Sequence, residues 1–376
     1  MTKHALLSPS SAHRWIKCTP SAVLEEKFEN TTSVAAEEGT AAHAWCEYKL
    51  NKLLNRPCEK PSTEYDSNEM QECSDAYVDF VMEKYEQAKL NCQDPILLIE
   101  QKVDFSAYVP DGFGTADCII VGEKTLQVID FKYGQGVLVD AYENPQMKCY
   151  ALGALTLFDS LYEIQNVEMS IFQPRRDNVS TFTLPVTELI SWAESVLKPK
   201  AELAIKGEGE FEAGDWCRFC RAKATCRKRA EENLKLAELE FKEPSVLTDS
   251  EIEEVLTLIP KLTKWADDVL AYATDSAINH GKQWSGYKLV EGRSVRKFKD
   301  ETAVIEKAKA AGFTDIFKTS LIGLTEMQKL MGKKKFEDIL GDLIIKPSGK
   351  LTLVPDSDKR AKVNVTNVNQ EFKKEN

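Results

Sequence analysis

The stretch of sequence that decides the fold runs from Asp117 to Lys132 and reads DCIIVGEKTLQVIDFK. Two runs of mainly apolar and β-branched residues flank the polar link 122–125 (GEKT), a pattern that predicts a β-hairpin with a four-residue loop. If the residues on either side of this loop pair with each other, Asp117 lies directly opposite Asp130 on the neighbouring strand. The two acidic side chains then share one face of the hairpin.

Two carboxylates so paired have β-carbons about 5 Å apart, and like charges at that distance destabilise a sheet. They need a cation or a shared proton between them. Lys132 follows Asp130 by two residues and therefore lies on the same face. Hard oxygen ligands suit Mg²⁺ or Mn²⁺, and a nearby lysine can orient an attacking water. The residues predict a divalent-metal site; the alternative is a surface Asp130–Lys132 ion pair with Asp117 capping a strand.

Two predicted helices carry further polar side chains towards this hairpin. The first spans about 35–54 and contains His43, one of only four histidines in the chain. The second begins at Pro145, runs to about residue 158 and places Gln146 and Tyr150 one turn apart. Each of these side chains taken alone is also compatible with a purely structural role.

The rest of the chain divides into two parts. Up to residue 244 the pattern predicts further helices at 68–90 and 187–205 and strands within 96–131, 167–174 and 180–186. From residue 245 the sequence pattern changes, so we expect a larger domain over 1–244 and a smaller α+β region over 245–376. The second region is expected to contain a helix at 248–281, a hairpin over 287–298 that turns at Glu291-Gly292, and short helices within 300–341.

Taken in order, these elements resemble the RecB-type branch of the PD-(D/E)xK nucleases, which shows GxxxH, an aspartate, DxK and QxxxY. Here they stand as Gly39 to His43, Asp117, Asp130-Phe131-Lys132 and Gln146 to Tyr150. The resemblance implies an α/β fold with a mixed central sheet flanked by helices, as in restriction endonucleases. It implies metal binding by His43, Asp117, Asp130 and the Phe131 carbonyl, and catalysis by Lys132 with Asp117, Asp130, Gln146 and Tyr150. Glu100, on the preceding strand, is expected at most to assist.

A second motif is formed by three of the ten cysteines. Cys217, Cys220 and Cys226 stand in a CxxC-x5-C arrangement, which indicates a metal site because thiols stay reduced in the cytosol. The ligand count is one short of four. This fits either a zinc site or an iron–sulfur cubane completed from elsewhere in the chain.

The same segment resembles CRISPR-associated adaptation exonucleases and the AddB-type recombination subunit, in which the fourth cysteine lies far upstream. Residues 8–20 look like that upstream element, so Cys18 is implied as the fourth ligand. The resemblance implies a four-iron four-sulfur (4Fe–4S) cluster with a structural role, and zinc remains the alternative. The basic residues around the motif are expected either to contact DNA phosphates or to form a solvated helix end. They are Arg218, Arg221, Lys223, Arg227, Lys228 and Arg229.

Composition limits the functions that fit. The net charge of −11 argues against a protein that coats nucleic acid, although a local basic groove remains compatible with it. No apolar run reaches the ~20 residues that span a bilayer, and the first residues lack a secretory signal, so a cytoplasmic location is expected. We expect a Mg²⁺- or Mn²⁺-dependent deoxyribonuclease, an exonuclease by preference, acting with phage replication or recombination proteins. Its rivals are a DNA-binding scaffold that does not cut and, less well supported, an electron-transfer protein.

Overall fold

The computed structural model describes residues 5–29, 32–158, 160–235, 248–292, 296–317, 321–345, 351–355 and 360–363. The chain divides into two compact units, Met1–Val255 and Leu256–Asn376. The domain boundary expected at residues 244 and 245 lies outside the described residues.

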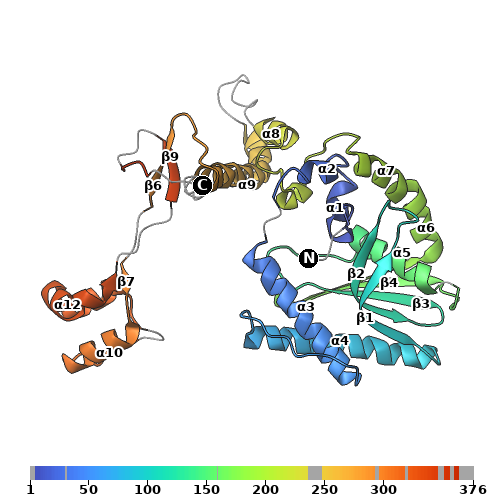
Figure 1. Cartoon of the computed structure of the whole chain (residues 1–376), viewed down its shortest axis with the longest axis horizontal. Coiled ribbons are helices and arrows are strands. Elements are labelled where there is room, and N and C mark those ends of the chain that lie inside the picture. Colours follow the sequence, from blue (N-terminus) through green and yellow to red (C-terminus); the bar gives the residue numbers. More distant parts are fainter. Residues whose placement is uncertain are drawn as a thin grey trace, which may run out of the picture. The chain divides into compact units, whose positions relative to one another are not determined.

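The first unit is built on a five-stranded sheet with the strand order β1-β2-β3-β4-β5 (Figure 1). All neighbouring strands are antiparallel except β3 and β4, which are parallel and are connected through helix α5 (Pro145–Phe158). The prediction of an α/β fold with a mixed sheet flanked by helices is therefore confirmed. The strands are β1 (Ile96–Asp104), β2 (Phe113–Val121), β3 (Thr125–Phe131), β4 (Asn166–Gln173) and β5 (Asn178–Pro185).

Side chains that alternate along the strands build a separate core on each face of the sheet. Ile119 and Val128 belong to the core that includes α5, whereas Ile120 and Ile129 belong to the core under α3 (Val34–Leu53) and α4 (Asn68–Asn91). Central strands buried on both faces read as continuous apolar runs, which explains the sequence of the hairpin.

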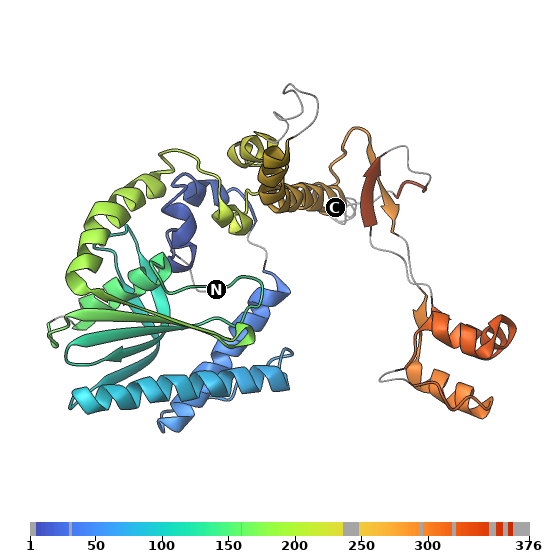
Figure 2. The same ribbon diagram turned by 180° about the vertical axis from the view of Figure 1, so that it is seen from behind.

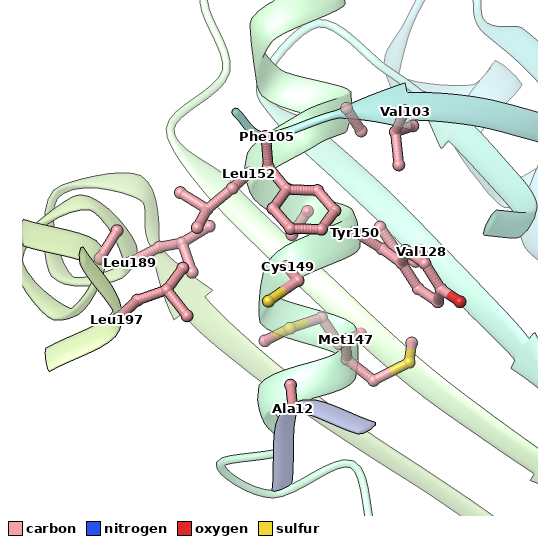
Figure 3. Packing of buried hydrophobic residues seen from close by; sticks show 14 of the residues in the cluster. Ala12, Val103, Phe105, Val128, Met147, Cys149, Tyr150, Leu152, Leu189 and Leu197 are labelled. Atoms are coloured by element: carbon pink, nitrogen blue, oxygen red, sulfur yellow. The ribbon is translucent and has the colours of Figure 1, made fainter. Parts of the chain in front are cut away.

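The face that carries α5 is also covered by residues from the N-terminal segment and from the helices that follow β5. Figure 3 shows Met147 and Leu152 of α5 among Ala12, Leu189 and Leu197. The short N-terminal elements are η1 (Pro9–Ser11), α1 (Ala12–Trp15) and α2 (Ser21–Glu25). The later ones are η2 (Pro174–Arg176), α6 (Val186–Trp192), a π-helical turn (Ala193–Leu197), α7 (Lys198–Lys206), η4 (Asp215–Phe219) and α8 (Arg227–Leu234).

The hairpin predicted over 287–298 is wrong. β6 (Tyr287–Glu291) pairs with β9 (Leu351–Pro355), and β7 (Lys297–Phe298) pairs with β8 (Ile344–Ile345). Both strands find partners far along the chain, which a local turn signal cannot reveal.

The helices of the C-terminal region are α9 (Asp249–Asn279), within which the two units divide, and α10 (Glu301–Ala310), α11 (Leu324–Met331) and α12 (Lys333–Leu340). The last three, orange in Figure 2, share a small core that includes Val304, Met327 and Phe336. Among the described residues, we find no helix of the length and apolarity needed to cross a bilayer.

Candidate metal centres

The register predicted for the acidic hairpin is confirmed. β2 pairs with β3 so that Val121 is opposite Leu126, and the ladder continues in that register towards the other end of the hairpin. The last pair of the ladder is Cys118 with Ile129, and the same register places the next residues, Asp117 on β2 and Asp130 on β3, opposite each other. Oδ2 of Asp117 accepts a hydrogen bond of 2.7 Å from the Phe131 backbone N–H, so the carboxylate takes the place of a backbone acceptor there.

Glu100 on β1 extends these two carboxylates to a row of three across adjacent strands. The β1–β2 ladder is interrupted at Glu100 and Asp117, which lie opposite each other between two regular pairs. Glu100 has a φ of 48°, in the left-handed region that residues other than glycine rarely adopt. Strain of this kind costs about 1 kcal/mol or more and concentrates at functional sites. The row Glu100–Asp117–Asp130 is called the carboxylate row below.

His43 lies beside the carboxylate row because α3 packs closely on the sheet through small residues such as Ala42, which is fully buried. Its Nδ1 is 3.4 Å from Oδ1 of Asp117 and 3.9 Å from Oε1 of Glu100. The ring stands edge-on to Phe131, with 5.4 Å between ring centroids. One ligand atom from each of His43, Glu100 and Asp117 lies within 4.8 Å of the others, an arrangement able to hold a metal ion.

The charges of this group depend on one another. Burial opposes a positive charge on His43, but the carboxylates of Asp117, Glu100 and Asp130 outweigh it and raise the pKa of His43 to about 10. Burial raises the pKa of Glu100 and of Asp130. At Asp117 burial acts in the same direction, but the His43 charge overcomes it and the pKa is lowered. Without another cation, the imidazolium supplies the positive charge that clustered carboxylates require.

Lys132 and Gln146 hold the third carboxylate of the row. Lys132 Nζ is 2.8 Å from Oδ2 of Asp130 and donates to Oε1 of Gln146 at 3.1 Å. Gln146 Nε2 donates to Oδ1 of Asp130 at 3.0 Å and to the Tyr150 hydroxyl at 3.3 Å. The start of α5 is fixed by Asn144, whose Oδ1 accepts from the Gln146 backbone N–H at 3.0 Å. Because the Asp130 side chain is only 3 % exposed, the acidic partner of the Asp130–Lys132 pair is buried, so this is not a surface ion pair.

The structure thus brings the sequence-predicted residues His43, Asp117, Asp130, Lys132, Gln146 and Tyr150 to one place. Helices from opposite faces of the sheet contribute to it, α3 with His43 and α5 with Gln146 and Tyr150. The Phe131 side chain is buried against the rings of His43 and Tyr77. Glu100 is closer to the centre of the site than the sequence indicated.

The four cysteines proposed as a cluster line one cavity, called the cysteine cavity below. Cys18 follows α1, and Cys217 lies in η4. Cys220 directly follows η4, and Cys226 directly precedes α8. Backbone N–H groups point at two of the sulfurs: Glu212 N lies 3.5 Å from Sγ of Cys18, and Gly214 N lies 3.4 Å from Sγ of Cys217.

The environment of these thiols fits a bound cation. Burial raises the pKa of Cys18 and Cys217, and raises that of Cys220 to about 12. These three thiols are therefore neutral unless a metal ionises them. Arg14 and Arg229 line the same cavity and are 8 % and 6 % exposed. Both arginines favour the charged form of the Cys217 thiol, as thiolate ligands of a metal centre require, although Arg14 is also paired with Glu25.

Several basic residues near the cysteine motif are used within the fold. Arg14 forms a buried ion pair with Glu25 and donates to the Phe219 carbonyl at 3.2 Å. Glu25 Oε1 in turn accepts from the Arg221 backbone N–H at 2.6 Å, and the Arg221 side chain donates to the carbonyls of Glu25 and Phe28. Three other basic side chains of the motif are exposed: Arg218, Arg227 and Lys228.

The chain belongs to the family described as "Protein of unknown function (DUF2800)", whose model matches residues 4–361. The chain is similar to a solved structure titled "Crystal structure of SSO0001", with 15 % sequence identity and a TM-score of 0.23. The match covers 49 % of this chain and 95 % of that chain. A likeness at this level carries no argument about the fold or the function.

Proposed function

We propose that this protein is a Mg²⁺- or Mn²⁺-dependent deoxyribonuclease that hydrolyses the phosphodiester bonds of DNA. The observation that carries the proposal is the carboxylate row, with His43 at Asp117 and Lys132 at Asp130. Three carboxylates opposite one another on adjacent strands repel each other, and one of them, Glu100, lies on strained backbone. A cation-binding function accounts for this arrangement.

The donor set also bears on the choice of metal. Mg²⁺ prefers an octahedral shell made only of oxygen, whereas Mn²⁺ accepts an imidazole more readily. His43 Nδ1 beside two carboxylates therefore favours Mn²⁺. Either ion, when bound, would polarise a phosphate oxygen and lower the pKa of a water molecule.

The residues around Lys132 would do the rest of the chemistry. Lys132 is paired with Asp130 and donates a hydrogen bond to Gln146, and its ammonium group would have a further N–H to offer to a phosphate oxygen. A fixed positive charge at the place where negative charge develops lowers the barrier to hydrolysis. Tyr150 supports Gln146 through the hydroxyl contact, so its effect on the reaction is indirect.

In the cysteine cavity we propose a 4Fe–4S cluster, with a single zinc ion as the alternative. The support is the set of four sulfurs in one cavity, N–H groups directed at two of them, and the buried arginines nearby. The exposed side chains of Arg218, Arg227 and Lys228 would contact DNA phosphates. The proposed setting, phage DNA replication or recombination in the cytoplasm, and the preference for exonuclease action rest on the resemblance alone.

The test is cleavage of end-labelled single- and double-stranded DNA with Mn²⁺, Mg²⁺ or EDTA. We expect cleavage by the wild type with Mn²⁺, weaker cleavage with Mg²⁺ and none with EDTA. Lys132→Ala should lose activity while keeping its fold and its iron. Lys124→Ala, which removes an exposed lysine from the loop of the same hairpin, is the matched control and should cut like the wild type.

Iron and sulfide analysis of anaerobically purified protein tests the second metal centre independently. Broad absorption near 400 nm with iron and sulfide supports the cluster, and one zinc without iron supports the alternative. Metal-dependent DNA binding without cleavage by any preparation would contradict the enzyme and favour a DNA-binding scaffold.

A further inference from the structure

Charge is distributed unevenly between the two compact units of the chain. Residues 1–255 contain 27 lysines and arginines but 44 aspartates and glutamates, a formal net charge of −17. Residues 256–376 contain 22 basic and 16 acidic residues, a formal net charge of +6. A charge asymmetry of this size between two parts of one chain indicates that the basic part has an anionic partner.

Three consecutive lysines, Lys333, Lys334 and Lys335, stand out in the second unit and are called the lysine run below. They form the first turn of α12, and all three are exposed. Within the part of the chain that the structure describes, none of the three forms an ion pair, although Glu337 and Asp338 follow one turn later. Their charges are therefore available to a partner.

The packing of α12 determines where the lysine run points. Phe336 and Leu340 are fully buried in the small core that α12 shares with α10 and α11. Gly332 alone separates α11 from α12, and its φ of 77° lies in the left-handed region that favours glycine. The sharp turn and the buried face together hold the lysines at the surface of a folded element.

Two further basic side chains lie close to this pair of helices. Lys329 is exposed in the last turn of α11, one turn before Gly332. Arg296 is also exposed, and its Nη2 donates a hydrogen bond of 3.5 Å to Oε1 of Gln328 in α11. Positive charge at the surface thus extends from α12 to α11.

Charge and spacing together identify DNA as the partner. Exposed lysines spread over two helices fit the regularly spaced phosphates of a nucleic acid. The first unit, with its net charge of −17, repels DNA outside its local basic groups, so an enzyme acting on DNA needs a second source of affinity. A DNA-binding unit in the same chain would raise the local concentration of DNA at the carboxylate row.

We propose that the C-terminal unit binds DNA through the lysine run, with Lys329 and Arg296, by phosphate contacts that do not depend on base sequence. The choice of DNA rests on the proposed nuclease function and deepens it, because it states how an acidic enzyme is kept on its substrate. Hydrolysis would take place at the carboxylate row, while the C-terminal unit retains the DNA between cleavage events.

The experiment measures binding of the full-length protein to a labelled DNA duplex of random sequence, without added Mg²⁺ or Mn²⁺, over a range of salt concentrations. In Lys333→Gln/Lys334→Gln/Lys335→Gln the affinity at low salt should fall about tenfold or more. The slope of log K against log salt should become shallower by about 2.7, because each phosphate contact with duplex DNA contributes about 0.9. Circular dichroism, melting temperature and iron content should match the wild type.

The matched control is Lys27→Gln/Lys124→Gln/Lys200→Gln, which removes three exposed lysines from the first unit and changes the net charge equally. Its affinity and slope should stay close to those of the wild type. The same proteins are also tested with phosphatidylcholine vesicles that contain or lack phosphatidylserine, which should bind none of them.

Each outcome decides for or against the proposed surface. A wild-type slope in the lysine-run variant, or an equal loss in the control, overturns the inference and leaves the nuclease intact. Failure of the wild type to bind DNA, or binding to phosphatidylserine vesicles in place of DNA, overturns it as well. DNA binding that depends on the lysine run, without cleavage by the wild type in Mn²⁺ or Mg²⁺, supports the surface and contradicts the nuclease.

Discussion

The carboxylate row and the cysteine cavity are assembled by different physical means. The row comes from consecutive strands, and the ladder that aligns them also sets the spacing of Glu100, Asp117 and Asp130. The cavity joins a segment before α2 to one before α8, with few regular backbone pairs between them. One site is fixed by the sheet, whereas the other relies on side-chain contacts such as Arg14–Glu25.

The difference suggests what each site needs from its ligand. The sheet holds the carboxylates together whether or not a cation is present, so removing a ligand there should impair chemistry more than folding. In the cysteine cavity a bound centre would itself connect distant segments, so its loss should impair folding. Substitutions at the two sites should therefore separate stability from activity.

The largest effect is expected at Cys18. Cys18→Ala removes one of the four proposed ligands, so most of the iron should be lost and the free energy of unfolding should fall by roughly 3–5 kcal/mol, the scale of losing a structural cross-link. Iron analysis and urea denaturation measure both quantities. Cys58→Ser, at an exposed cysteine, should change neither. Full iron content in Cys18→Ala would exclude Cys18 as the fourth ligand.

The next effect concerns catalysis alone. Asp117→Asn keeps an oxygen for the Phe131 N–H but removes the charge beside His43. Cleavage with Mn²⁺ should fall by about 100-fold or more, as when a main electrostatic contact of a transition state is removed. Circular dichroism and iron content should match the wild type. A variant that cuts at the wild-type rate would remove Asp117 from the site.

A smaller effect should follow from adding metal to the wild type. An ion that binds only the folded protein stabilises it, by about 2.7 kcal/mol at 100 times its Kd. Mn²⁺ should therefore raise the melting temperature of the wild type in the absence of DNA, and Asp117→Asn should show little response. An equal rise in both proteins would mean that the stabilising ion binds elsewhere.

The smallest effect is expected from the strained backbone of the row. Glu100→Gly removes the cost of the left-handed conformation and one of three like charges, so the metal-free protein should gain about 1 kcal/mol. Gln101→Gly, one residue along in the regular ladder, should instead lose roughly 0.5–1 kcal/mol. Urea denaturation in EDTA distinguishes them; a loss in both would contradict the strain.

The parts of the site that were predicted from the sequence depend on local geometry. The β2–β3 register follows from a four-residue loop, and the helical positions of Gln146 and Tyr150 follow from a cap at Asn144. The residue ranges of α3, α4 and α5 agree with the patterns of the sequence to within about two residues.

Other features depend on contacts that the sequence does not encode locally. The β1–β2 register places Glu100 opposite Asp117, and the connection between these two strands is too long for the sequence to fix that register. The hairpin over 287–298 failed because β6 and β7 pair with strands more than forty residues away.

The shared cavity of Cys18 and Cys217 has a consequence for the order of events during synthesis. About 200 residues separate these two cysteines, and a ribosome adding roughly 5–20 residues per second needs on the order of 10–40 s between them. The Cys18 thiol therefore waits in a growing chain until the sheet and α7 have been made. If the proposed centre is present, delivery of its iron or zinc would be a late step, which follows translation of the first 226 residues.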